Sequence, residues 1–371
     1  MTENLKGDLF SVAEAFVDVS FIMDVVPLGN GNINDTYLVK LRNCGSEDFV
    51  LQKISSKVFK DPESIISNMK VSLEHIELKL LRDAGNIEGR NWRSTSLLKS
   101  RHNNKYWHRN QDEFWRATSY INAAYTTDLV RNYDDAEEVG IGLGIFHSLM
   151  DGLPLKKLIK TLDSFHVTPK YHQEYQKASN MGITDLCDRT QWCIDFIKKR
   201  EPIIDVLENA ICSGELCLRV IHGDPKVNNF LFDNITNKTV AMVDLDTLMA
   251  GLIHYDLGDC LRSACNPAGE EELDLSKVFF CIDSCKRLLN GYLSKTKKLL
   301  NEADYNYFYD AIRLIPFELG MRFFSDYLAG NIYFKVNHPS HNLERALVQF
   351  SLTKSIETQE FEIRQCIEEL R

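Results

Sequence analysis

Residues 220–234 read VIHGDPKVNNFLFDN, an apolar stretch that breaks into a polar loop and then resumes. Apolar runs that end abruptly in Gly, Pro, Asn and Asp are typical of strands joined by tight loops. Five polar side chains occupy the loop, at His222, Asp224, Lys226, Asn228 and Asn229. We therefore expect the loop to lie at the end of a core strand and to carry chemistry.

The spacing of these side chains indicates which chemistry. His222, Asp224 and Asn229 fit the pattern H-x-D-x-x-x-x-N, the catalytic-loop spacing of kinases, in which Asp meets the substrate hydroxyl and Asn reaches a metal ion. Lys226 lies where a cation can reach a transferring phosphoryl group. The alternative is a turn whose polar side chains only hydrogen-bond their own backbone. The pattern predicts Asp224 and Lys226 as catalytic residues and Asn229 as a metal ligand.

A second metal ligand is expected further along the chain. Two apolar stretches around an Asn/Thr/Asn turn follow Asn229, which favours a hairpin that returns Asp244 beside it. Mg²⁺ is held by one or two carboxylates together with phosphate oxygens and water, so Asp244 is the predicted second ligand. Asp246 would point the same way and is another candidate. Asp256, near the start of the next predicted helix, is expected to cap that helix or to be a buried acceptor that fixes the loop.

A glycine-rich segment, GNGNINDTY at residues 29–37, is the candidate phosphate loop. A dinucleotide fingerprint leads from a strand into a helix, whereas this segment leads into another β-like run, as a kinase phosphate loop does. An ordinary hairpin turn is the alternative. The residues expected to contact the nucleotide phosphates are Gly29, Asn30, Gly31 and Asn32. The adenine is expected to lie against residues 120–122, with contacts from Tyr120 and Asn122.

The predicted third strand, FVLQKI at residues 49–54, departs from the kinase pattern. Kinases place a lysine there for the α- and β-phosphates. Here Gln52 takes that place if Val50 faces the adenine, and Lys53 points to the opposite face. The source of the positive charge is therefore left open between Lys53 and another residue. Glu74 and Glu77, on the helix that follows, are expected to be solvated.

The whole chain favours an α+β fold with two lobes. Its 371 residues exceed the length that one core usually serves, and 44% hydrophobic with 26% charged residues is an ordinary globular composition. The first part shows β-like runs, one helix near residues 62–84, and a hairpin that joins 94–101 to 113–121. Long amphipathic patterns follow, interrupted by a strand pair near 216–221 and 239–245. We predict a nucleotide-binding lobe at 1–120 and a helical lobe at 121–371.

Charge and cysteine content exclude several classes of protein. The formal net charge of −10 argues against nucleic-acid or membrane partners. The first residues lack the pattern of a signal peptide, and no run approaches the ~20 apolar residues that span a bilayer, so a cytoplasmic location is expected. Ten cysteines are too sparse for a disulfide scaffold, and a structural zinc site is not expected. A monomer is favoured.

Residues 317–334, FELGMRFFSDYLAGNIYF, hold the candidate substrate contacts. Arg322 has Glu318 and Asp326 at i−4 and i+4, so one interpretation is an intrahelical ion pair. Its apolar neighbours favour another, because an arginine among aromatic residues is costly unless something polar requires it. A substrate contact by Arg322 and Tyr333 is predicted.

These motifs resemble those of the aminoglycoside phosphotransferase and choline kinase superfamily, through HGDPKVNN at 222–229, VDLD at 243–246 and YDLGD at 255–259. Within it the chain resembles the N-acetylhexosamine 1-kinases, through the glycine-rich segment, SFHVTPKY from residue 164 and the stretch that ends at Phe334. The resemblance implies a protein-kinase-like two-lobed fold and the use of ATP and Mg²⁺. It also implies phosphorylation of the C1 hydroxyl of N-acetylglucosamine or N-acetylgalactosamine.

The resemblance also implies roles for individual residues. It makes Asp224 the base, Asn229 and Asp244 the metal ligands, Arg322 and Tyr333 sugar contacts, and His166 and Thr168 part of a substrate-side loop. Asn32 stands where this family commonly has a histidine, which affects sugar preference. The rival functions are a kinase for another small alcohol, such as an aminoglycoside, choline or methylthioribose, and a non-catalytic nucleotide-binding regulator.

Overall fold

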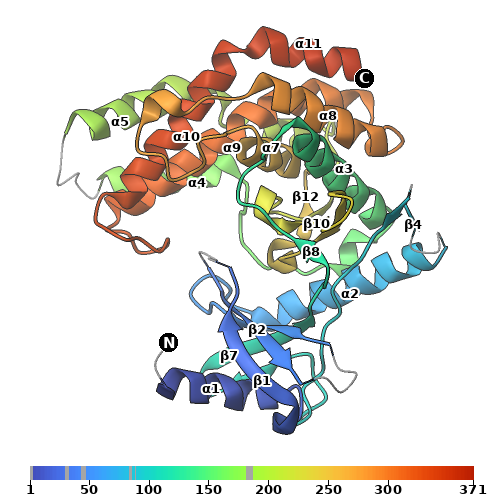
Figure 1. The fold of residues 1–371 in the computed structure, drawn as a ribbon. Coiled ribbons are helices and arrows are strands. Elements are labelled where there is room, and N and C mark those ends of the chain that lie inside the picture. The colour runs from blue at the N-terminus through green and yellow to red at the C-terminus, as the bar shows by residue number, and fades with distance from the viewer. Residues whose placement is uncertain (1–2, 30–32, 43–46, 83–85, 88, 181–186) are drawn as a thin grey trace.

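The computed structural model describes residues 3–29, 33–42, 47–82, 86–87, 89–180 and 187–371. The chain folds into two lobes, a small one built on a sheet and a larger one built mostly of helices (Figure 1). This confirms the predicted α+β kinase-like fold. Within the described residues no helix is both long and apolar enough to cross a membrane.

The first lobe is a five-stranded antiparallel sheet in the order β1-β2-β3-β7-β6. Its strands are β1 (Ile22–Pro27), β2 (Asp35–Leu41), β3 (Phe49–Ile54), β6 (His108–Asn110) and β7 (Glu113–Ser119). Helix α1 (Glu3–Glu14) covers one face, and alternate residues along the strands form the small core between them. The sheet presents its other face to the rest of the chain.

One expected strand pairing is found only in part. Within 94–101, residues 96–98 pair antiparallel with the end of β7: Leu97 bridges Thr118, the Leu98 amide donates to the Ala117 carbonyl at 2.9 Å, and the Ser119 amide donates to the Ser96 carbonyl at 2.9 Å. The start of β7 pairs with β6, which lies inside the segment expected to be a turn, with Asn110 opposite Glu113. The two-residue turn places Gln111 in the left-handed region, at φ 54°. Glycine usually marks such a tight turn in a sequence, and none is present here, so the sequence did not indicate the turn.

Helix α2 (Pro62–Arg82) follows the third strand and lies between the lobes (Figure 1). Near its start, the Asn68 amide donates to the carbonyl oxygens of Ile159 and Leu248, at 2.7 and 3.1 Å. Near its end, the Lys79 ammonium donates to the carbonyl of Ser148 at 2.8 Å. The helix belongs to the first lobe in sequence and is bound to the second at both ends.

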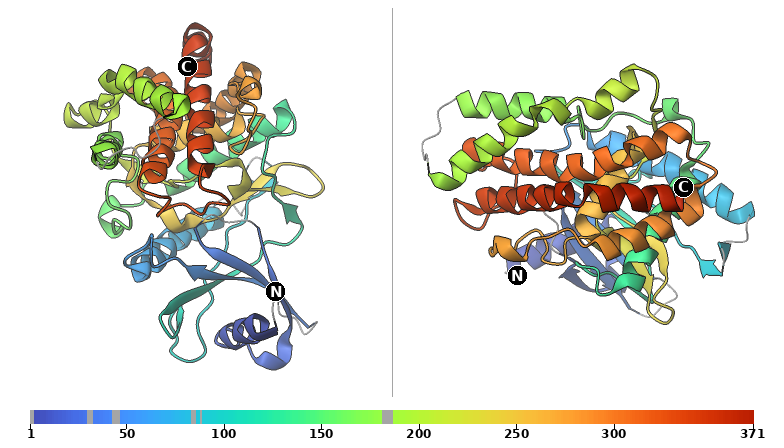
Figure 2. Two further views of the ribbon diagram at one scale, coloured as in Figure 1. Left: turned by 90° about the vertical axis from the view of Figure 1, so that its left-hand side faces the viewer. Right: turned by 90° about the horizontal axis from the view of Figure 1, so that it is seen from above.

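The second lobe is a bundle of helices around a few short strands (Figure 2). The helices are α3 (Tyr133–Met150), α4 (Thr168–Asn180), α5 (Asp188–Arg200), α6 (Val206–Cys212), α7 (Ile253–Ala264), α8 (Ile282–Thr296), α9 (Glu302–Leu328), α10 (His341–Thr358) and α11 (Glu360–Leu370). Helices α3 and α8 cross closely, because a Cβ atom on Gly140 would lie 2.0 Å from the Leu288 carbonyl oxygen. Such packing makes a rigid base for the loops that the helices carry.

The strands of the second lobe are β8 (Ala124–Tyr125), β9 (Arg219–Ile221), β10 (Phe230–Asp233), β11 (Thr239–Met242) and β12 (Met249–Gly251), and a two-stranded ribbon precedes them, β4 (Asn86–Ile87) with β5 (Arg90–Asn91). The hairpin of β10 and β11 is as predicted. The expected pairing of 216–221 with 239–245 is wrong, because β11 is taken by its nearer neighbour and β9 pairs with β12. Strand β8 pairs with β10, so the chain joins the second lobe directly after β7.

Candidate active site

The loop at residues 222–229, here called the catalytic loop, connects β9 to β10 and ends in the short helix η4 (Val227–Asn229). The carboxylate of Asp224 is 2.8 Å from the Lys226 ammonium. The Asn229 amide donates to the Asp224 carbonyl oxygen at 2.7 Å, which closes the loop on itself. His222 reaches the other way, to the Val243 carbonyl at 2.9 Å. The loop therefore holds the acid, the cation and the amide together.

The hairpin of β10 and β11 returns the chain to this loop. The Val243 amide donates to the Asn229 carbonyl at 2.9 Å, so Asp244 follows immediately beside Asn229. Asp244 adopts a left-handed conformation, φ 64°, and precedes the short helix η5 (Leu245–Thr247). A non-glycine residue held in this region is a strained position of the kind that clusters at functional sites. The three predicted residues Asp224, Asn229 and Asp244 thus meet at one place.

The electrostatic environment of Asp224 and Asp244 favours a bound cation. Burial raises the pKa of Asp224; Lys226 opposes that rise, and Asp259 and Asp244 add to it. Burial also raises the pKa of Asp244, with Asp246 adding to the rise and Lys226 and Arg116 opposing it. Two carboxylates whose charged forms are disfavoured chiefly by burial, and further by neighbouring acids, are stabilised by a cation bound beside them.

The donor set fits Mg²⁺ in particular. Among the described residues no group of three or more His, Cys, Asp or Glu side chains is arranged to hold a metal ion. The protein therefore offers an open set, the carboxylate of Asp244 and the amide oxygen of Asn229. Mg²⁺ is usually bound by one or two such oxygens together with substrate phosphates and water.

Asp256, at the start of α7, holds the catalytic loop in place. Its carboxylate is fully buried and accepts the backbone N–H groups of His222 and Gly223 at 2.7 and 2.8 Å. The ring of His147 approaches the same carboxylate at 2.8 Å from α3. The prediction of a buried acceptor is confirmed, whereas the N-cap position of α7 belongs to Leu252.

On the nucleotide side, the structure describes part of the predicted set. Gly29 has φ 71°, and Asn30, Gly31 and Asn32 lie outside the described residues. The Tyr120 amide donates to the Asp48 carbonyl at 3.3 Å, and the Asn122 carbonyl accepts from Arg93. Segment 120–122 therefore forms the link between the lobes, where an adenine is expected. Glu74 and Glu77 are exposed on α2, as predicted.

On the opposite side of the catalytic loop, Arg322 is not part of an intrahelical ion pair. Glu318 accepts from His166 at 3.0 Å and from Thr168 at 2.7 Å. Asp326 accepts the backbone N–H groups of residues 332–334 at 2.8 to 2.9 Å. Both carboxylates accept hydrogen bonds from groups outside the helix, so the ion-pair interpretation is wrong.

The Arg322 guanidinium lies in a cage of aromatic rings, 4.8 to 5.6 Å from the ring centres of Phe165, Tyr171 and Phe334. Tyr333 is 45% exposed and sits on the turn that Asp326 fixes. His166 is buried, and both of its ring nitrogens face protein oxygens, one of them the Gly223 carbonyl at 2.9 Å. His166 therefore lies behind the catalytic loop, and its ring contacts protein groups.

These residues were compared with known proteins. The sequence profile of the phosphotransferase enzyme family matches residues 24–281, well over half of the chain. The chain belongs to this phosphotransferase family. Solved structures share its fold over almost the whole length. A microcompartment-associated aminopropanol kinase has a TM-score of 0.61 at 15% identity, covering 96% of this chain and 98% of its own.

Two further structures show the same fold. The choline kinase from Cryptosporidium parvum Iowa II has a TM-score of 0.57 at 15% identity, covering 99% of this chain and 98% of its own. A spectinomycin phosphotransferase, solved with ADP and spectinomycin, has a TM-score of 0.56 at 13% identity, with 96% and 98% covered. At these identities the likeness establishes the kinase-like fold of this phosphotransferase.

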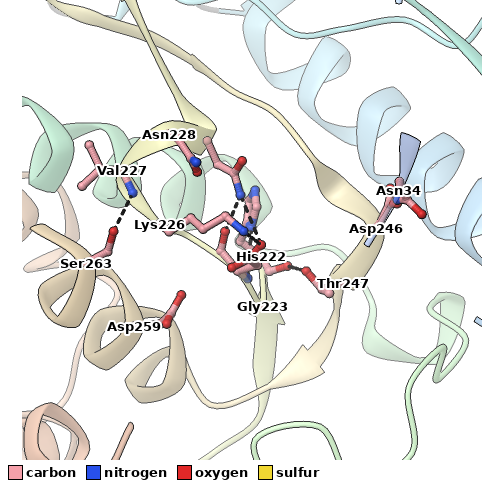
Figure 3. Close-up of polar contacts among 12 residues, drawn as sticks. Asn34, His222, Gly223, Lys226, Val227, Asn228, Asp246, Thr247, Asp259 and Ser263 are labelled. Atoms are coloured by element: carbon pink, nitrogen blue, oxygen red, sulfur yellow. Dashed lines mark hydrogen bonds and ion pairs between the residues drawn. The ribbon is translucent and has the colours of Figure 1, made fainter. Parts of the chain in front are cut away.

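One residue of the phosphotransferase site was missed by sequence reasoning. Asp259 lies one turn after Asp256 on α7, and its Oδ1 accepts from the Arg262 Nε at 2.8 Å. Its Oδ2 is buried and accepts no hydrogen bond from the described residues. Figure 3 shows the Asp259 carboxylate turned from α7 toward the catalytic loop. The i, i+3 spacing in YDLGD was the available signal, because it puts both acids on one helix face.

Proposed function

We propose that this phosphotransferase transfers the γ-phosphoryl group of ATP to the C1 hydroxyl of an N-acetylhexosamine, giving the sugar 1-phosphate. The observation that carries the proposal is the aromatic cage of Arg322. A half-buried guanidinium among aromatic rings, with no acidic partner in the described part of the helix, favours a ligand that offers oxygen acceptors. An acetamido carbonyl and ring hydroxyls supply them, and the sequence resemblance to N-acetylhexosamine 1-kinases points the same way.

The proposed reaction assigns one task to each residue of the loop. The Asp224 carboxylate accepts a hydrogen bond from the C1 hydroxyl and takes its proton as the new O–P bond forms. The bond between the γ-phosphorus and the bridging oxygen breaks, and ADP leaves. Lys226 supplies positive charge beside the group in transfer. Mg²⁺, held by Asn229 and Asp244, would neutralise charge on the phosphates.

The nucleotide is proposed to lie between the lobes, with its adenine against Tyr120 and Asn122 and its phosphates beneath residues 29–32. Gln52 lies on the sheet face next to those phosphates. On the acceptor side, Arg322 and Tyr333 are proposed to bind the sugar, and Asn32, outside the described residues, stays a predicted sugar contact from the glycine-rich segment. The free Oδ2 of Asp259 is proposed to accept a sugar hydroxyl or the acetamido N–H. His166 supports the Gly223 carbonyl beneath the catalytic loop.

An acceptor panel tests this proposal. N-acetylglucosamine, N-acetylgalactosamine, glucose, glucosamine, methylthioribose, choline and kanamycin are each incubated with ATP and Mg²⁺, and ADP release is followed. We expect turnover with the two N-acetylhexosamines, with the new phosphate placed on C1 by phosphorus NMR. Phosphorylation of the amines alone would overturn the proposal. Tight nucleotide binding with no turnover of any acceptor would favour a regulator.

A second candidate is a kinase of an amine-bearing alcohol, and one observation favours it. The unpaired Oδ2 of Asp259, beside Asp224, is a carboxylate that an ammonium group could meet. The Arg322 cation in the same half of the site works against such a ligand by charge repulsion. Choline and kanamycin in the panel decide between the two candidates.

Replacing Arg322 with Gln separates acceptor binding from nucleotide binding. We expect kcat/KM for N-acetylglucosamine to fall about 10- to 100-fold, because a hydrogen bond to a charged group contributes about 1.5 to 3 kcal/mol. The KM for ATP should not change, since Arg322 lies on the opposite side of the catalytic loop. Steady-state kinetics, with each substrate varied in turn, measure kcat/KM for the sugar and the KM for ATP. An unchanged KM for the sugar would remove Arg322 from the acceptor site.

A further inference from the structure

The third strand of this protein lacks the lysine that kinases use, and the structure places another cation beside that position. Strand β3 pairs with β7 so that Gln52 stands directly opposite Arg116. Residues opposite each other in a sheet share a face, so the two side chains meet. The Arg116 Nε and Nη2 both donate to the Gln52 carbonyl oxygen, at 3.0 and 2.7 Å. Gln52 therefore orients a guanidinium.

Arg116 is buried and reaches the second lobe. Its side chain is the largest of those with less than 2% of their surface exposed. Its Nη2 forms an ion pair with Asp246, the residue two positions after Asp244. Asn34 donates to the same Asp246 carboxylate, next to which Figure 3 draws it, and accepts the backbone N–H of Ser55 at 2.9 Å. Burying a guanidinium costs free energy, and we expect such a network where the charge has a function.

The present contacts of Arg116 leave some of its N–H groups available to another acceptor. The ion pair with Asp246 lacks the alignment of a hydrogen bond, since Asp246 Oδ1 accepts none from the described residues. Among the described residues, the one acceptor of the Arg116 Nη1 is the Met69 sulfur, a weak acceptor, at 2.8 Å. An oxyanion would satisfy these N–H groups better than the present partners do, because guanidinium and phosphate match in geometry.

The other candidate cation is engaged elsewhere. Lys53 lies one residue after Gln52, so it points to the opposite face of β3. There it forms an ion pair with Glu113, and both side chains are more than one third exposed.

We propose that Arg116 binds the α- and β-phosphates of the nucleotide in place of the third-strand lysine, with Gln52 orienting it and Asp246 as its counter-ion before the nucleotide arrives. The inference rests on the proposed function only in requiring that the site binds a nucleotide. On binding, the phosphates replace Asp246 beside the guanidinium. Asp246 then remains next to Asp244, at the metal side of the site.

The test measures binding of Mg²⁺-ADP and of adenosine by titration calorimetry. Arg116→Gln should weaken Mg²⁺-ADP about 10- to 100-fold, the effect of losing a charge-assisted phosphate contact, and leave adenosine unchanged. The double variant Gln52→Lys with Arg116→Gln moves the charge to the usual kinase position and should recover most of the lost affinity. Lys53→Gln is the matched control on the other face and should bind both ligands as the parent chain does.

Two results would overturn the inference. One is Mg²⁺-ADP binding by Arg116→Gln at parental affinity. The other is an equal loss of affinity for adenosine and Mg²⁺-ADP that the double variant does not repair, which would mean that Arg116 only supports the fold. These titrations contain no acceptor. If the protein fails to phosphorylate hexosamines, the titrations therefore still test whether Arg116 binds the nucleotide phosphates.

Discussion

Replacing Asp224 with Asn is expected to lower kcat by about 10²- to 10⁴-fold, the usual contribution of a positioned general base. The amide keeps the size of the side chain but cannot take the proton of the acceptor hydroxyl. It also loses the ion pair with Lys226, whose ammonium is 2.8 Å from the carboxylate. Nucleotide affinity should stay nearly normal, because the proposed role of Asp224 is toward the acceptor hydroxyl. Steady-state turnover and Mg²⁺-ADP titration measure the two effects.

The control for this variant is Asp112→Asn, which makes the same chemical change in the exposed turn between β6 and β7. It should retain parental turnover and affinity. Turnover near the parental rate in Asp224→Asn would contradict the role of the carboxylate and, with it, the whole assignment of the catalytic loop.

Replacing Asp256 with Ala is expected to have the largest effect on stability. The change leaves the backbone N–H groups of His222 and Gly223 buried without an acceptor and takes away the partner of His147. Each orphaned group costs about 1 to 3 kcal/mol, so the free energy of unfolding should fall by about 3 to 5 kcal/mol. Urea denaturation followed by fluorescence measures it. Asp256→Asn keeps one acceptor oxygen and should lose less.

The same carboxylate predicts a dependence on pH. Burial alone would raise the pKa of Asp256, but the contacts with His147 and with the loop amides outweigh it and lower the pKa below its ordinary value of 3.8. A folded-state pKa below the unfolded one means that the unfolded chain binds more protons. The stabilisation is therefore present above pH 3.8 and is lost as the pH falls through the lowered value. The parental chain should lose stability in acid more steeply than Asp256→Asn, and equal slopes would contradict this account.

The catalytic loop and its hairpin could be predicted because their signals are local. Asp224, Asn229 and Asp244 lie within one strand, loop and hairpin, where spacing alone fixes which side chains meet. Helix α2 was predicted for the same reason, from the period of its apolar residues. Asp256 needed only the expectation that a buried carboxylate beside a loop accepts backbone N–H groups.

Contacts between distant segments could not be predicted from spacing. The partner of Gln52 lies 64 positions away, and only the register of β3 with β7 reveals it as Arg116. Helical spacing offered Glu318 and Asp326 as ion-pair partners of Arg322, one of two interpretations. That pattern does not show the segments 164–168 and 332–334, whose groups these acids bind. The expected pairing of β9 failed, and that of 94–101 with β7 was found only in part, because several strands compete for one partner and the sequence does not rank them.

Helix α2 is bound to second-lobe carbonyls by Asn68 and Lys79, and this has a consequence for control of the enzyme. In protein kinases the equivalent helix swings toward or away from the cleft, and regulators act by choosing between the two positions. Here that swing would break hydrogen bonds at both ends of the helix. We therefore expect a constitutively assembled enzyme, whose rate in the cell follows the supply of its small substrates.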